Sequence, residues 1–104
     1  MILSTTETIP NREISEVKGI ARGSTVRTRN VGRDILAGLK NLVGGEIEEY
    51  TKLQADAREQ ALQRMITDGS KLGADAIVNV RFTTSVITQA ASEVLAYGTA
   101  VMLK

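Results

Sequence analysis

The chain has 104 residues, of which 13 are basic and 12 acidic, so its formal net charge is +1. It contains neither cysteine nor histidine, which excludes disulfides, thiolate chemistry and imidazole catalysis. The small net charge argues against nucleic-acid binding, because proteins that bind nucleic acid usually carry a basic excess. These totals predict a single globular domain over residues 1–104, with a core of Ala, Val, Ile and Leu.

The chain begins MILSTTETIP, which lacks the basic segment and long apolar run of a signal peptide. No stretch approaches the roughly 20 apolar residues that a membrane-spanning helix needs. We therefore expect a cytoplasmic protein that does not interact with membranes.

The first two segments are rich in β-branched residues. Residues 2–9 predict a short strand that Pro10 ends. Residues 14–29 predict either one long strand or a hairpin interrupted near Gly23 and Ser24.

A short helix is predicted next, because apolar residues recur at intervals of three and four before a glycine pair stops the pattern. These residues are Val31, Ile35, Leu39 and Leu42, followed by Gly44 and Gly45.

The clearest pattern lies between Glu46 and Leu72 and predicts a helix roughly 40 Å long, at ~1.5 Å per residue. Its apolar stripe consists of Tyr50, Leu53, Ala57, Ala61, Met65 and Leu72. The acidic residues Glu46, Glu48 and Glu49 suit the first turn of a helix better than acid–base catalysis. Gly73 is a suitable residue to end the helix.

Two strands complete the chain. Residues 76–87 alternate between apolar and polar, residues 88–93 form a polar turn, and residues 94–103 form the last strand. The predicted fold class is α+β, with an antiparallel sheet of long strands covered by the long helix plus the short helix.

Small residues alternate along one face of two predicted strands. They are Gly19, Ala21 and Gly23 after Val17, and then Ala96, Gly98 and Ala100. Such a face would let a helix bearing Ala57 and Ala61 approach the sheet closely. Alternatively, the glycines mark bulges or bends.

The opposite face of the last strand is also apolar, and it carries Leu95, Tyr97, Val101 and Leu103. One helix covers only one face of a sheet, so the short helix or a neighbouring subunit must cover the other. These four residues are the candidate oligomer interface.

Basic residues gather between Arg22 and Lys40, opposed by the single acid Asp34. The candidate patch consists of Arg27, Arg29, Arg33 and Lys40. It is either a site for a small anion or a set of ion pairs with the acidic helix start across an interface, and we favour the second. No catalytic residue, cofactor-binding loop or metal site is indicated elsewhere.

Several motifs resemble the YbjQ family of small bacterial proteins. They are STTET at 4–8, Gly44-Gly45 followed by Tyr50, Leu53 with Ala57-Arg58, LGADAIVNV at 72–80 and YGTAV at 97–101. The resemblance implies a two-layer α+β subunit with one main helix, assembled into pentamers that can stack as decamers. It also carries a label of heavy-metal binding.

We therefore expect a non-catalytic homo-oligomeric module, pentameric or decameric, that binds an unidentified small molecule or partner. The alternative is a metal-binding protein that uses carboxylate and hydroxyl oxygens. Soft metals such as zinc and copper prefer thiolate and imidazole ligands, and the chain has neither.

Overall fold

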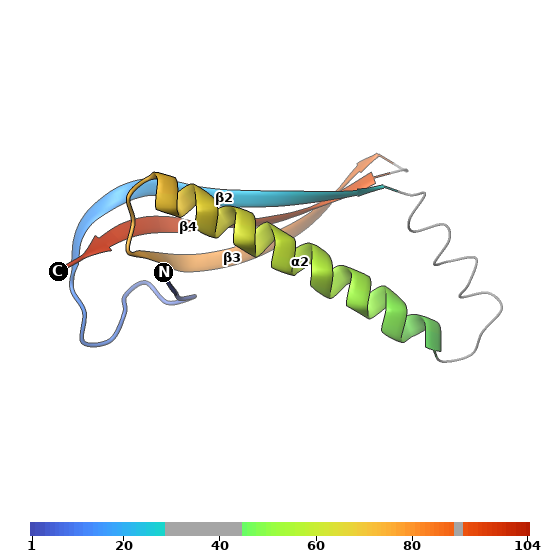
Figure 1. Cartoon of the computed structure of the whole chain (residues 1–104), viewed down its shortest axis with the longest axis horizontal. Helices are drawn as coiled ribbons and strands as arrows, with labels where there is room; N and C mark the ends of the chain where they lie inside the picture. Colours follow the sequence, from blue (N-terminus) through green and yellow to red (C-terminus); the bar gives the residue numbers. More distant parts are fainter. Residues whose placement is uncertain (29–44, 89–90) are drawn as a thin grey trace.

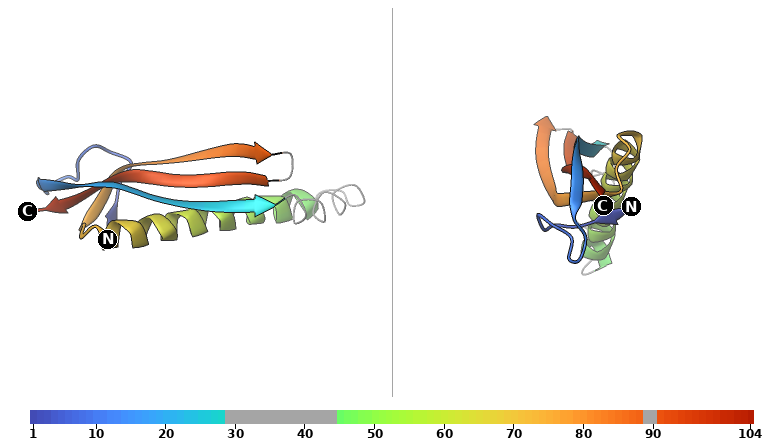
Figure 2. Two further views of the ribbon diagram at one scale, coloured as in Figure 1. Left: turned by 90° about the horizontal axis from the view of Figure 1, so that it is seen from above. Right: turned by 90° about the vertical axis from the view of Figure 1, so that its left-hand side faces the viewer.

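The computed structural model describes residues 1–28, 45–88 and 91–104. It contains strands β1 (Ile2–Leu3), β2 (Ile14–Thr28), β3 (Ala76–Thr88) and β4 (Ala91–Leu103), and helix α2 (Gly45–Lys71). The strands form one sheet in the order β1-β3-β4-β2, and α2 lies along one face of it (Figures 1 and 2). The α+β class is confirmed, whereas the predicted short helix falls outside the described residues.

The sheet is mixed rather than wholly antiparallel, because β1 pairs parallel with the start of β3. The strand expected over residues 2–9 is shorter than predicted, because β1 contains only Ile2 and Leu3. Beyond it, the Ser4 N–H donates to the Ile77 carbonyl and the Ser4 carbonyl accepts from the Val80 N–H, both at 3.0 Å. The Thr6 N–H bonds the Ser4 hydroxyl instead, and such local side-chain bonds compete with a regular strand.

The second strand is continuous, so the hairpin alternative is wrong. Gly23 and Ser24 pair in register with Ala96 and Leu95 of β4. Register shifts occur only nearer the start of the strand, and one of them falls at Gly19, whose φ is 136°. The glycines therefore have different roles: Gly19 belongs to a bulge, whereas Gly23 does not.

Gly23 lies where α2 touches the sheet. A Cβ atom added there would lie 2.2 Å from the Met65 backbone nitrogen and 2.5 Å from the Ala61 carbonyl oxygen. The predicted close approach of the helix is thus confirmed at this point. The main core lies between α2 and the sheet. It consists of Ala21, Ala57, Ala61, Met65, Ile77, Val80, Val94, Ala96 and Ala100.

The end of α2 agrees with the prediction. Gly73 has a φ of 82°, and its N–H donates to the Ser70 carbonyl at 3.0 Å. The Ala74 N–H donates to the Gly69 carbonyl at 3.1 Å, which completes a Schellman motif. Within the described residues, no helix is both long and apolar enough to cross a membrane.

The outer face of the sheet carries a second, smaller core. It consists of Ala76, Val78, Val101 and Leu103, with Ile9 and Ile14 packed against it. The N-terminal segment therefore covers this end of the face that α2 leaves open. The polar turn expected over residues 88–93 is shorter than predicted, because β3 extends to Thr88 and β4 begins at Ala91.

Candidate functional site

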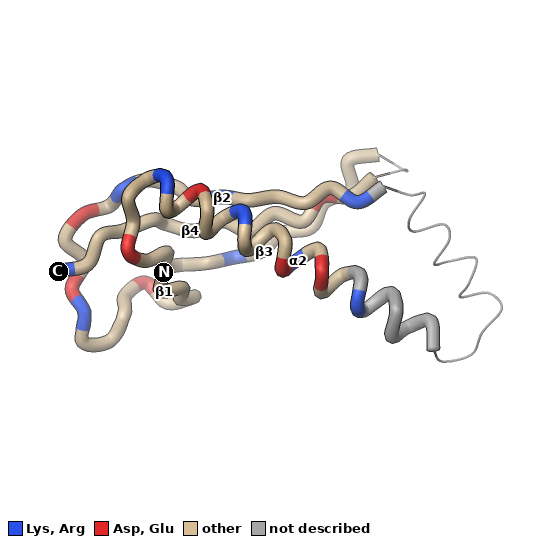
Figure 3. The backbone as a smooth tube through the Cα atoms, in the orientation of Figure 1, with Lys and Arg blue, Asp and Glu red and all other residues tan. Residues whose placement is uncertain are grey.

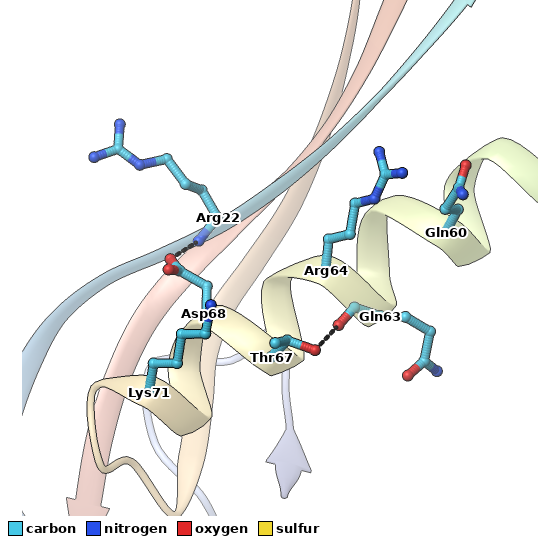
Figure 4. Close-up of a pocket in the computed structure, with 7 residues that line it drawn as sticks. All are labelled: Arg22, Gln60, Gln63, Arg64, Thr67, Asp68 and Lys71. Atoms are coloured by element: carbon cyan, nitrogen blue, oxygen red, sulfur yellow. Dashed lines mark hydrogen bonds between the residues drawn. The ribbon is translucent and has the colours of Figure 1, made fainter.

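An open groove with a volume of about 370 Å³ lies between α2 and the edge strand β2 (Figure 4). We name it the edge groove. Its lining side chains are all polar or charged: Arg22 from β2, and Gln60, Gln63, Arg64, Thr67, Asp68 and Lys71 from α2. The surface that these residues expose to the groove is nevertheless more apolar than polar, since long polar side chains also present their methylene groups.

The six α2 residues share one side of the helix because they are spaced by one, three or four positions. Two hydrogen bonds fix that side against the edge of β2. The Arg22 N–H donates to Asp68 Oδ2 at 3.0 Å, and Arg64 Nη1 donates to the Ser24 carbonyl at 2.6 Å. Since these backbone groups belong to an edge strand, the bonds also block pairing with another strand there.

Positive charge predominates in the edge groove. Arg64 and Lys71 lie on α2 on either side of a single carboxylate, Asp68, one of whose oxygens already accepts the Arg22 backbone N–H, whereas the Arg22 guanidinium points away from Asp68 (Figure 4). None of the three cations forms an ion pair with a side chain in the described part of the chain. Acidic and basic residues are otherwise interspersed along the described part of α2 (Figure 3), so the helix does not present the basic stripe of a nucleic-acid binder.

The hydrogen bonds within the edge groove also restrict two of its neutral groups. Gln63 Nε2 donates to the exposed Glu59 carboxylate at 3.1 Å, and the Thr67 hydroxyl donates to the Gln63 carbonyl at 3.1 Å. The carboxamide oxygen of Gln63 and the hydroxyl oxygen of Thr67 are thereby left as acceptors.

Of the predicted basic patch, only Arg27 lies among the residues that the structure describes. This residue lies near the end of β2 opposite Ser92, and its side chain is half-buried. Its Nε and the hydroxyl of buried Thr25 have no hydrogen-bond partner among the described residues.

The other three members of that patch, Arg29, Arg33 and Lys40, lie outside the described residues. The same holds for the side chains of Glu46, Glu48 and Glu49. Both interpretations of the patch therefore stay predictions.

The candidate oligomer interface divides into two halves. Val101 and Leu103 are 1% and 7% exposed within the smaller core, so their apolar character is explained without a second subunit. Leu95 is half-buried, whereas Tyr97 is 38% exposed on the outer face of the sheet. Any subunit contact at this face would therefore use Leu95 and Tyr97 first.

Sequence reasoning missed most of the edge groove. The signal was present, because polar residues recur at helical spacing from Gln60 to Lys71 beside the apolar stripe. Arg22 could not be assigned to the same site, since its distance from the helix depends on which strand lies beneath α2.

The residues do not fit a site for a heavy metal. The whole chain lacks thiol and imidazole groups, which such ions prefer. Within residues 1–28, 45–88 and 91–104, no three acidic side chains are close enough to hold an ion together.

Comparison with known proteins identifies close relatives. A sequence model of the YbjQ family, described as "Putative heavy-metal-binding", matches residues 1–104. A UPF0145 protein of Archaeoglobus fulgidus is 62% identical over 104 residues, covering 100% of this chain and 96% of the relative. One of Vibrio campbellii is 57% identical over 103 residues, covering 99% of each chain. The relatives thus include archaeal as well as bacterial proteins, which is broader than the bacterial family expected.

The fold is shared with a solved protein of unknown function. The crystal structure of that protein, from Pediococcus pentosaceus, has a TM-score of 0.65 and 17% sequence identity, covering 100% of this chain and 98% of the other. At this identity the likeness concerns the fold alone. The resemblance noted in the sequence is confirmed by the family match and by the relatives, and the chain belongs to the YbjQ family.

Proposed function

We propose that this protein is a non-catalytic module that assembles into a ring, a pentamer or a stacked decamer, and binds a small anion on its subunits. Catalysis is left out of the proposal because the chain lacks the residues of a nucleophilic triad and no acid–base pair stands out. Two kinds of surface support the proposal: a sheet edge that the chain leaves open, and the positively charged edge groove.

The observation that carries self-assembly is the exposed second half of β3. All residues from Arg81 to Thr88 are exposed, including Phe82 at 45%, Val86 at 78% and Ile87 at 54%. The hydrogen bonds from the N-terminal segment to the β3 backbone end at Val80. A long strand edge with unpaired backbone groups is a site where a second chain readily adds.

The outer face of the sheet adds to this surface. Val17 and Ile20 of β2 are 64% and 66% exposed, and Tyr97 lies nearby on β4, opposite Arg22. Contiguous exposed apolar side chains commonly mark interaction sites. A second subunit bound to this face would bury side chains that the chain's own N-terminal segment does not cover.

The two long edges of the sheet differ in how far they are open to another chain. One edge, at β2, is blocked by Asp68 and Arg64 of the helix, whereas the second half of β3 is open. A ring needs a head-to-tail contact between unlike surfaces, which here would be the open β3 edge and the outer face near Tyr97, whereas β3 paired with β3 would give a two-fold dimer. The pentamers implied by the family resemblance are rings of this kind.

The test compares the tag-free protein with a variant carrying Val86→Lys and Ile87→Lys. Both side chains are exposed, so the charges should leave the subunit folded but should make a buried contact costly. We expect size-exclusion chromatography with light scattering to show a smaller particle, and circular dichroism to show unchanged helix content. The matched control is Ala55→Lys, which adds a charge on exposed α2 surface and should keep the wild-type mass.

Two results would overturn the proposal. One is a wild-type protein that stays monomeric at micromolar concentration. The other is a double variant that retains the full mass of the wild-type particle, which would show that β3 is not at the contact.

A further inference from the structure

The open edge of β3 begins at a defined point. The N-terminal segment covers this edge as far as Val80, whose N–H donates to the Ser4 carbonyl at 3.0 Å. Arg81 closes the covered part, because its Nη1 donates to the Thr5 carbonyl at 2.9 Å. Beside residues 82–88, no strand that the structure describes lies on this side of β3, since β1 pairs only with the start of β3. The open edge is therefore about 20 Å long, at ~3.3 Å per residue.

The backbone along this edge is ready to pair. The Val80 N–H points toward the edge, where the N-terminal segment accepts it. Because successive residues of a strand direct their N–H and C=O groups to opposite sides, Phe82, Thr84 and Val86 direct theirs to the same edge. Water or another strand must satisfy these groups.

The two long edges differ in how they are protected against pairing. The β2 edge is protected, because Asp68 and Arg64 bond the Arg22 N–H and the Ser24 carbonyl. The open β3 edge has the sequence FTTSVIT at 82–88, which contains no charge, no proline and no glycine and consists mostly of β-branched residues. Natural sheet edges that face water usually carry such interruptions, so this composition is typical of a strand that is paired.

The neutral composition also indicates which strand pairs with it. When a strand pairs antiparallel with its own copy about a two-fold axis, residues near the axis face themselves, and a charge there would face an equal charge. The stretch around Ser85 avoids this repulsion. The first half of the β2 edge is a poorer partner, because two register shifts interrupt it and it carries the Lys18–Glu16 ion pair. The regular open edge that a second copy offers is therefore its own β3.

We propose that β3 pairs antiparallel with β3 of a second copy, with the two-fold axis at Ser85, the midpoint of the open edge. Ser85 then faces the partner's Ser85, Thr84 faces the partner's Val86, and Thr83 faces the partner's Ile87. The last two are β-branched cross-strand pairs, one on each face of the joined sheet. The inference rests on the self-assembly of the proposed function. Of the two contacts open to β3, it assigns the two-fold one, which would join two rings into a decamer.

Disulfide trapping tests this pairing, because the chain contains no cysteine and a single introduced cysteine can react only with its own copy. In a non-hydrogen-bonded antiparallel pair the two Cα atoms lie about 4.5 Å apart, within the roughly 4.4–6.8 Å that a disulfide spans. Ser85→Cys, oxidised with diamide at micromolar protein concentration, should therefore give a covalent dimer on a non-reducing gel. The matched control is Thr83→Cys, which is equally exposed on the same face. Its two copies would lie about 13 Å apart along the paired strands, so it should stay monomeric on the gel.

Two further samples test the register and the contact. Co-expressed Thr83→Cys and Ile87→Cys chains should give a mixed covalent dimer, although neither variant does so alone. Adding Val86→Lys to Ser85→Cys should abolish the covalent dimer while circular dichroism stays unchanged, because Val86 is 78% exposed in the subunit.

Light scattering on the untreated wild type separates this inference from the ring. An assembled wild type whose Ser85→Cys variant gives no covalent dimer overturns the β3 pairing and leaves self-assembly standing. Equal trapping of Thr83→Cys and Ser85→Cys also overturns the pairing. A covalent Ser85→Cys dimer, found together with a wild-type mass of only two subunits, supports the pairing and refutes the ring.

Discussion

The most severe consequence of the fold concerns Gly23, because the backbone of α2 rests directly on it. In a Gly23→Ala variant the new Cβ would lie 2.2 Å from the Met65 nitrogen, 2.5 Å from the Ala61 oxygen and 2.6 Å from the Arg64 carbonyl carbon. Real Cβ atoms do not approach other atoms this closely, so something must move. Every one of these neighbours is a backbone atom of the helix, and no side-chain rotation can relieve the clash.

The helix must therefore move away from the sheet, and two costs add. Overpacking a core usually costs about 1–3 kcal/mol, and a rigid backbone neighbour places this case at the upper end. The shift also strains the hydrogen bonds from Asp68 and Arg64 to β2, which are of the kind worth roughly 1.5–3 kcal/mol each. We expect a loss of about 3 kcal/mol or more, which for a chain of this size lowers Tm by roughly 10–20 °C.

Thermal unfolding followed by circular dichroism, at fixed protein concentration, measures this loss. Gly73→Ala is the matched control, because Gly73 has a φ of 82° but no atom within 4 Å of an added Cβ. The control should lose only the cost of a left-handed backbone, about 1–2 kcal/mol. A Gly23→Ala variant that melts with the wild type, or above Gly73→Ala, would refute the close packing.

Three further predictions concern the core and metals. Gly98→Val should lower the free energy of unfolding by about 1–3 kcal/mol in a urea titration, because an added Cβ lies 2.6 Å from Ile77 Cγ2 and 2.9 Å from the Val78 carbonyl oxygen; an unchanged midpoint would contradict this. Val101→Asp should prevent folding, as judged by circular dichroism, because it buries an unpaired carboxylate at a side chain that is 1% exposed; a folded variant would show that this cluster opens to water. Zinc, copper and cadmium should bind weakly or not at all in calorimetry after removal of any histidine tag, and a tight stoichiometric complex would prove this wrong.

The parts of the fold that depend on local sequence were predictable. The long helix and its end at Gly73 follow from the apolar stripe and from a glycine that tolerates positive φ. The pairing of β1 was not predictable, because the edge that a first strand joins depends on contacts distant in sequence. Nothing in residues 2–9 specifies a parallel partner at Ala76.

The glycines of β2 show where sequence patterns become ambiguous. A glycine in a strand can mark a turn, a bulge or a close contact, and the sequence left all three open at Gly23. The position of α2 decides among these three roles, because glycine is required where the helix backbone touches the strand. The edge groove could not be predicted for the same reason, because it also depends on the position of α2. Its two sides are 38 or more residues apart along the chain, from Arg22 to Gln60.

The candidate interface stays a prediction, although two of its four residues are buried within the subunit. Val101 and Leu103 belong to it because one helix covers only one face of a sheet, so that either the short helix or a neighbouring subunit was expected to cover the other. In the structure, Ile9 and Ile14 pack against them. The hydrophobic periodicity of the sequence does not reveal that these two residues contribute to the core. The surfaces that remain exposed for assembly are the second half of β3 and the outer face near Tyr97.

The mass of the native particle tests the central claim most directly. The tag-free protein, analysed by native mass spectrometry at micromolar concentration, should give a particle of five or ten subunits of 11.2 kDa. A particle of another symmetric size would keep self-assembly but refute the pentamer. A monomer under these conditions would contradict the proposed assembly, because the exposed β3 edge from Arg81 to Ile87 would then stay uncovered.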